Sequence, residues 1–76
     1  MHDTFNAIAT IVADKLSIEK SKISLDSTLE ELGADSLDLV EIIMKIEEEF
    51  GIQIDDAKAE TLKDVRDVVV YVDSLK

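Results

Sequence analysis

Apolar residues recur every three or four positions in three separate stretches of the chain, which predicts three amphipathic helices. We expect the first over residues 3–16, the second over 36–50 and the third over 64–75. The predicted buried faces of the first and third are Phe5, Ile8, Ala9, Val12 and Leu16, and then Val65, Val68, Val69, Val72 and Leu75. Together with a short fourth helix over 56–61, this pattern predicts an all-α four-helix bundle.

The third stretch also admits a second interpretation. The run from Val68 to Val72 is rich in β-branched residues, which favours a strand by propensity. The inward positions 65, 68, 69 and 72 nevertheless follow the 3.6-residue period, and no convincing partner strand is found in the sequence. We therefore expect a helix.

Short polar residues and one glycine mark where the helices should begin and end. The candidate N-caps, in chain order, are Asp3 or Thr4, Asp35 or Ser36, Asp55 or Asp56, and Asp64. Gly51 is expected to end the second helix, because glycine readily adopts the left-handed conformation that terminates helices.

A long connection, at about residues 17–35, separates the first two helices. Connections of this length are often functional. Its polar sequence is interrupted by apolar residues that we expect to hold it against the core, namely Ile18, Ile23, Leu25, Leu29 and Leu32. Two Ser/Thr-x-x-Glu patterns, Ser27 with Glu30 and Thr28 with Glu31, could each cap a short turn.

The second helix carries apolar residues on two opposite faces. One face, predicted to be core, consists of Leu39, Ile42, Ile43, Ile46 and Phe50. The other consists of Leu37, Val40 and Met44, interleaved with glutamates. Because so small a bundle cannot easily bury both faces, we expect these three side chains to be exposed, as at a transient protein interface. The alternative is that they pack beneath the long connection.

Composition narrows the possible functions. With 76 residues we expect one domain over 1–76, and the absence of Cys excludes disulfides and Cys-ligated metal centres. The net charge of −10 comes from the segment between Asp26 and Glu60, which holds twelve acids and two bases. Such a chain repels nucleic acid and anionic lipid, so its partners should be basic. No 18-residue apolar run or leader is seen, and we expect no membrane span and a cytoplasmic location.

Ser36 lies where the long connection meets the second helix. An ordinary capping role is one interpretation, and modification by another enzyme is a second, because a helix N-terminus favours a phosphate group. Self-catalysis is not expected, since a nucleophilic serine needs a base and His2 is the single histidine of the chain. We predict no catalytic residue and no metal site.

The residues Gly33-Ala34-Asp35-Ser36-Leu37-Asp38-Leu39-Val40-Glu41, with Met44 and the run 47–50, resemble the signature of acyl carrier proteins of type II (dissociated) fatty acid synthesis. The resemblance covers essentially the full chain. It implies that Ser36 carries 4′-phosphopantetheine, donated by coenzyme A through a separate magnesium-dependent phosphopantetheinyl transferase. The arm would hold the growing acyl chain as a thioester, and the chain would be a carrier and not an enzyme.

The resemblance also implies a docking surface for basic patches on ketoacyl synthases, reductases, dehydratases and acyltransferases. Its residues would be Asp35, Leu37, Asp38, Val40, Glu41, Met44, Glu47 and Glu48. A monomeric carrier is expected.

Two departures from the family concern the loops: Leu29 stands where many relatives have Phe, and the segment 52–57 lacks a frequent Pro. Lys45 slightly weakens the acidic footprint. Two rival functions stay open at this point. One is a carrier for a peptide, polyketide or cell-wall pathway, and the other is an unmodified acidic interaction module that binds divalent cations weakly.

Overall fold

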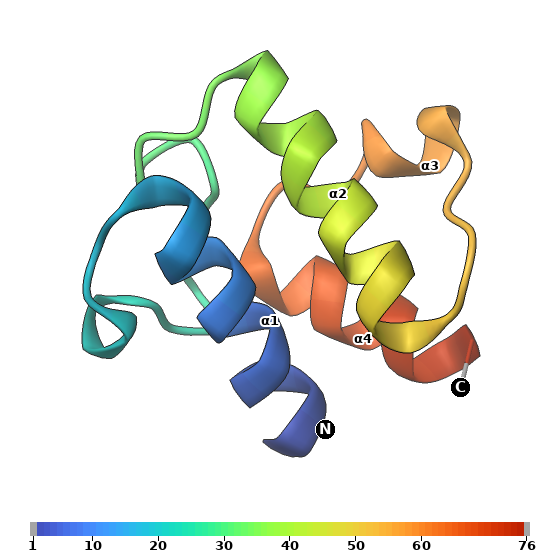
Figure 1. The fold of residues 1–76 in the computed structure, drawn as a ribbon, viewed down its shortest axis with the longest axis horizontal. Coiled ribbons are helices and arrows are strands. Elements are labelled where there is room, and N and C mark those ends of the chain that lie inside the picture. The colour runs from blue at the N-terminus through green and yellow to red at the C-terminus, as the bar shows by residue number, and fades with distance from the viewer. Residues whose placement is uncertain (1, 76) are drawn as a thin grey trace.

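Four α-helices follow one another in the computed structural model, which describes residues 2–75 (Figure 1). They are α1 (His2–Leu16), α2 (Ser36–Phe50), α3 (Asp56–Ala59) and α4 (Val65–Leu75), with a 3-10 helix η1 (Lys20–Lys22) in the long connection. The described residues contain no strand, only an isolated bridge between Thr28 and Asp64. The prediction of an all-α four-helix bundle is confirmed, and the valine-rich stretch is helical. None of the helices in residues 2–75 is long and apolar enough to cross a membrane.

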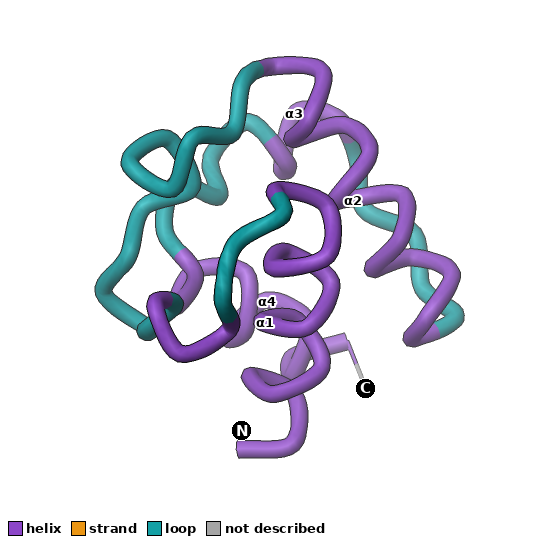
Figure 2. Tube along the Cα trace, turned by 60° about the vertical axis from the view of Figure 1, so that its left-hand side comes forward, coloured by secondary structure: helices purple, strands orange, loops and turns teal. Residues whose placement is uncertain are grey.

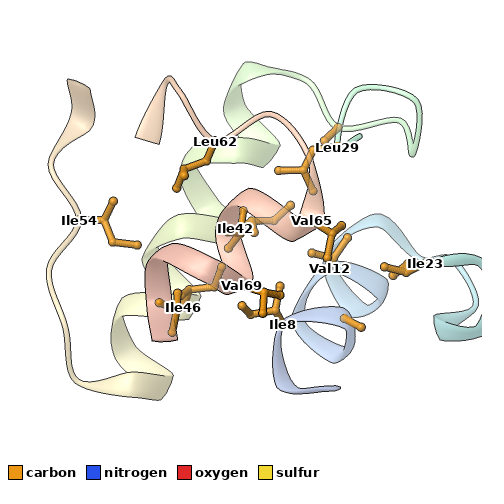
Figure 3. Close-up of a cluster of buried hydrophobic side chains, with 14 residues drawn as sticks. Ile8, Val12, Ile23, Leu29, Ile42, Ile46, Ile54, Leu62, Val65 and Val69 are labelled. Carbon is orange, nitrogen blue, oxygen red and sulfur yellow. The ribbon is translucent and has the colours of Figure 1, made fainter. Parts of the chain in front are cut away.

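Helix α1 packs against both α2 and α4, and the core lies where these three helices meet (Figure 2). The side chains that fill it are fully buried branched aliphatics contributed by each helix (Figure 3): Ile8 and Val12, Ile42 and Ile46, and Val65 and Val69. Burying these apolar side chains is the main force that holds α2 in place.

The long connection is fastened to the start of α4 by backbone hydrogen bonds. The amide of Leu29 donates to the Lys63 carbonyl at 3.1 Å, and the amide of Val65 donates to the Ser27 carbonyl at 2.9 Å. Leu29, which stands where many relatives have Phe, is buried and belongs to the core. The connection therefore reaches the N-terminus of α2 as an anchored segment.

Several predicted helix boundaries are confirmed. The Asp64 carboxylate accepts the Asp67 amide at 2.8 Å and caps α4. Gly51 adopts a left-handed conformation, φ 65°, and ends α2. In the connection, Thr28 and Glu31 accept each other's amides as a capping box, at 3.1 and 2.9 Å.

Two predicted features of α1 and α4 are wrong. Helix α1 begins at His2, so Asp3 and Thr4 lie inside its first turn and do not cap it. Thr4 is buried and its hydroxyl donates to Asp73, because the start of α1 packs against α4. Leu75 is 42% exposed, since it lies in the last turn of α4, beyond the core.

The short helix also differs from its prediction. Helix α3 ends at Ala59, two residues before the expected position 61. Asp55 occupies the N-cap position, but its side chain makes no capping hydrogen bond. With so few residues, α3 gains little from its own hydrogen bonds and depends on neighbouring contacts.

Candidate functional site

Ser36 is the first residue of α2, and its side chain is exposed. The capping of the helix is done by its neighbours: the Asp35 carboxylate accepts the Asp38 amide at 2.8 Å, and the Asp38 carboxylate accepts the Asp35 amide at 3.2 Å. Within residues 2–75 the Ser36 hydroxyl makes no hydrogen bond. The fold therefore leaves this hydroxyl free to react.

An apolar patch follows Ser36 along the outer face of α2. Its members are Leu37, Val40 and Met44, which are 65%, 55% and 56% exposed. The alternative that they pack beneath the long connection is thereby excluded. The opposite face of α2 is inward, with Ile42 and Ile46 buried. An exposed apolar patch of this kind is suited to contact with another protein.

Glu41 lies beside the apolar patch and is ion-paired within the chain. Its carboxylate accepts a hydrogen bond from the Lys15 ammonium, which comes from the last turn of α1. This hydrogen bond to Glu41 raises the pKa of Lys15, and the charges of Asp38 and Asp35 act in the same direction. The acidic start of α2 therefore already holds one cation.

Glu47, in the last turn of α2, has a structural contact of its own. Its carboxylate accepts the backbone amide of Ile54 at 2.7 Å, and Ile54 is 6% exposed. A buried amide without a partner is costly, so this bond fixes the α2–α3 connection to α2. Glu48 next to it is exposed and makes no hydrogen bond or ion pair with the described part of the chain.

The predicted docking residues therefore lie on one helix, but their environments differ. Asp35 and Asp38 cap α2, whereas Glu41 and Glu47 bind elsewhere in the chain. Sequence reasoning missed Lys15 altogether. The sequence places Lys15 at the C-terminal end of the first predicted helix. Any lysine is favourable there because of the helix dipole, so this position did not indicate that Lys15 pairs with Glu41.

Acidic side chains do not converge on a metal site in the described residues. No group of three or more His, Cys, Asp or Glu side chains there could hold a metal ion. The acidic side chains of α2 are spread along the length of the helix.

Comparison with known proteins identifies the family. Residues 6–72 match the family described as "Phosphopantetheine attachment site". The chain is 47% identical to an acyl carrier protein of Campylobacter jejuni subsp. doylei, over 96% of each chain. It is 43% identical to an acyl carrier protein of Helicobacter hepaticus, over 97% of this chain and 99% of the relative. An acyl carrier protein of Campylobacter hominis is also 43% identical, over 96% of this chain and 94% of the relative.

Proposed function

The chain belongs to the acyl carrier protein family, a family of carriers and not of enzymes, and on this premise we propose that Ser36 is the residue that bears 4′-phosphopantetheine. The chain carries acyl groups in fatty acid synthesis. When attached, the arm supplies a thiol that holds the growing acyl chain as a thioester.

The single observation that supports this assignment best is the free, exposed hydroxyl of Ser36 at the N-terminus of α2. Because Asp35 and Asp38 cap the helix, esterification of Ser36 removes no hydrogen bond from the fold. In the proposed loading step the Ser36 oxygen bonds to phosphorus and loses its proton. The pyrophosphate bond of coenzyme A breaks and releases 3′,5′-adenosine diphosphate. A separate magnesium-dependent phosphopantetheinyl transferase supplies the base and the metal.

A carrier of this family interacts with enzymes of fatty acid synthesis. We propose that ketoacyl synthases, reductases, dehydratases, acyltransferases and the transferase present basic patches to α2. The proposed contact residues are Asp35, Leu37, Asp38, Val40, Glu41, Met44, Glu47 and Glu48. Exposed carboxylates speed and orient the encounter, while three apolar side chains are too few for a long-lived complex. We expect a monomer, because a shuttle must leave each enzyme quickly. We expect it to act in the cytoplasm.

Charge reversal at Glu41 tests the docking surface. We expect Glu41→Lys to weaken binding to a ketoacyl synthase by about five- to thirtyfold, because a partner cation would then meet a like charge. Raising the salt concentration should weaken wild-type binding in the same direction. The matched control is Glu19→Lys, an equal charge change at an exposed residue before η1. Equal affinities for both variants, or an affinity that ignores salt, would contradict electrostatic docking.

The proposed attachment is tested on the wild-type chain. Incubation with coenzyme A, magnesium and a bacterial phosphopantetheinyl transferase should add the mass of one phosphopantetheine group, as read by intact-protein mass spectrometry. Omitting the transferase should leave the mass unchanged, because no base within residues 2–75 is hydrogen-bonded to the Ser36 hydroxyl to activate it. A wild-type chain that gains no mass with all components present would refute the carrier function.

A further inference from the structure

Lys15 joins the acidic face of α2 from a different helix. Helix α1 packs against α2 (Figure 1). The Lys15 ammonium bonds to the Glu41 carboxylate. The two side chains remain 31% and 43% exposed. The pair is therefore at the surface, within reach of a docking protein, and Glu41 is one of the proposed contact residues.

The position of Lys15 makes it a local counter-charge for the start of α2. Glu41 binds it directly, and Asp38 and Asp35 also favour its charged form. Asp35 and Asp38 lie within two residues of Ser36, so the cation neutralises part of the negative field next to the attachment point. Glu48, further along the helix, has no such partner in residues 2–75.

We propose that Lys15 is an internal competitor that sets the affinity of docking at Glu41, an inference that rests on the proposed function. An incoming lysine or arginine of a partner meets a carboxylate whose oxygen is already bonded and whose charge is already compensated. The partner must displace Lys15 or share Glu41 with it. Either event reduces the binding free energy that the partner gains from its contact with Glu41. Lys15 therefore keeps complexes weak and quickly reversible.

The test compares variants that remove one positive charge at different places. In Lys15→Met the competitor is lost. In Lys22→Met the same charge is lost from η1, which lies on the opposite side of α1 from α2 (Figure 2). The dissociation constant for a bacterial phosphopantetheinyl transferase is measured for each. We expect Lys15→Met to bind about two- to fivefold more tightly than Lys22→Met, the range that corresponds to one exposed ion pair.

A second comparison separates competition from a general change in charge. Glu41→Gln should weaken transferase binding more in the Lys15→Met background than in the wild type, because Glu41 is fully available only when Lys15 is gone. Lys15→Arg keeps the cation and should bind like the wild type. If Lys15→Met is poorly folded, Lys15→Gln takes its place in both comparisons, because it also removes the cation but keeps a polar side chain at this half-exposed position.

The outcomes distinguish this inference from the function on which it rests. If Lys15→Met binds no more tightly than Lys22→Met while the transferase still loads the wild-type chain, the competitor role is refuted and the carrier function stands. Weaker binding by Lys15→Met would refute it too, because it would show that Lys15 holds Glu41 in place for partners. A wild-type chain that is not loaded overturns the carrier function, and the inference with it.

Discussion

Ser36→Ala should gain no phosphopantetheine under conditions in which the wild-type chain is fully loaded, and should keep the wild-type fold. Loading is lost because the reacting oxygen is absent. The fold persists because the Ser36 hydroxyl makes no hydrogen bond in the described residues, and Asp35 and Asp38 cap α2 without it. Intact-protein mass spectrometry gives the first result, and a thermal unfolding curve followed by circular dichroism gives the second.

A matched serine variant controls for the substitution itself. Ser21 is also exposed and lies in η1, far from the start of α2 along the chain. Ser21→Ala should be loaded as completely as the wild type. Loading of Ser36→Ala would contradict the proposed attachment site, whereas a large drop in its melting temperature would contradict the view that the fold leaves this hydroxyl free.

Glu47→Ala should lower the free energy of unfolding by about 1–3 kcal/mol, because it leaves the buried Ile54 amide without its acceptor. For a domain of this size the change corresponds to a fall in melting temperature of about 5–20 °C. Glu48→Ala removes an equal charge next to it and should change stability by about 0.5 kcal/mol or less. Urea unfolding of both variants measures the difference.

A third variant shows whether the hydrogen bond or the charge of Glu47 matters. Glu47→Gln keeps a side-chain oxygen that can accept the Ile54 amide, and should lose less stability than Glu47→Ala. Equal stability losses for Glu47→Ala and Glu48→Ala would contradict the structural role of Glu47. Glu47 would then contribute no more to stability than an ordinary surface carboxylate.

Helix positions were predictable because their signals are local. The inward spacing of valines in α4 outweighed their strand propensity once these side chains could enter a shared core. Asp64 and Gly51 act at helix ends through contacts within a few residues, which a sequence pattern contains directly. The exposure of Met44 could likewise be predicted, because one helix offered two apolar faces to one small core.

What could not be predicted depends on contacts between distant segments. Thr4 has the sequence context of a cap, but packing of α1 on α4 buries it against Asp73. The pair of Lys15 and Glu41 joins residues 26 positions apart, and only the packing of α1 on α2 brings them together. Nothing in the residue pattern gives the orientation of one helix against another.

The acidic charge of α2 therefore has more than one role. Asp35 and Asp38 stabilise the helix that presents Ser36, and Glu47 holds the connection that follows it. Glu48 makes no such contact within residues 2–75, and Glu41 is shared with Lys15. Substitutions along this face should accordingly separate into those that change stability and those that change docking.

We propose that this chain carries its acyl group at one residue, Ser36, beside the proposed docking residues of α2. The most direct test is to load the wild-type chain with coenzyme A and a phosphopantetheinyl transferase, and to locate the added group by fragmentation mass spectrometry. We predict one phosphopantetheine group per chain, on the fragment that contains Ser36. An added group on any other residue, or no added group, would contradict attachment at Ser36.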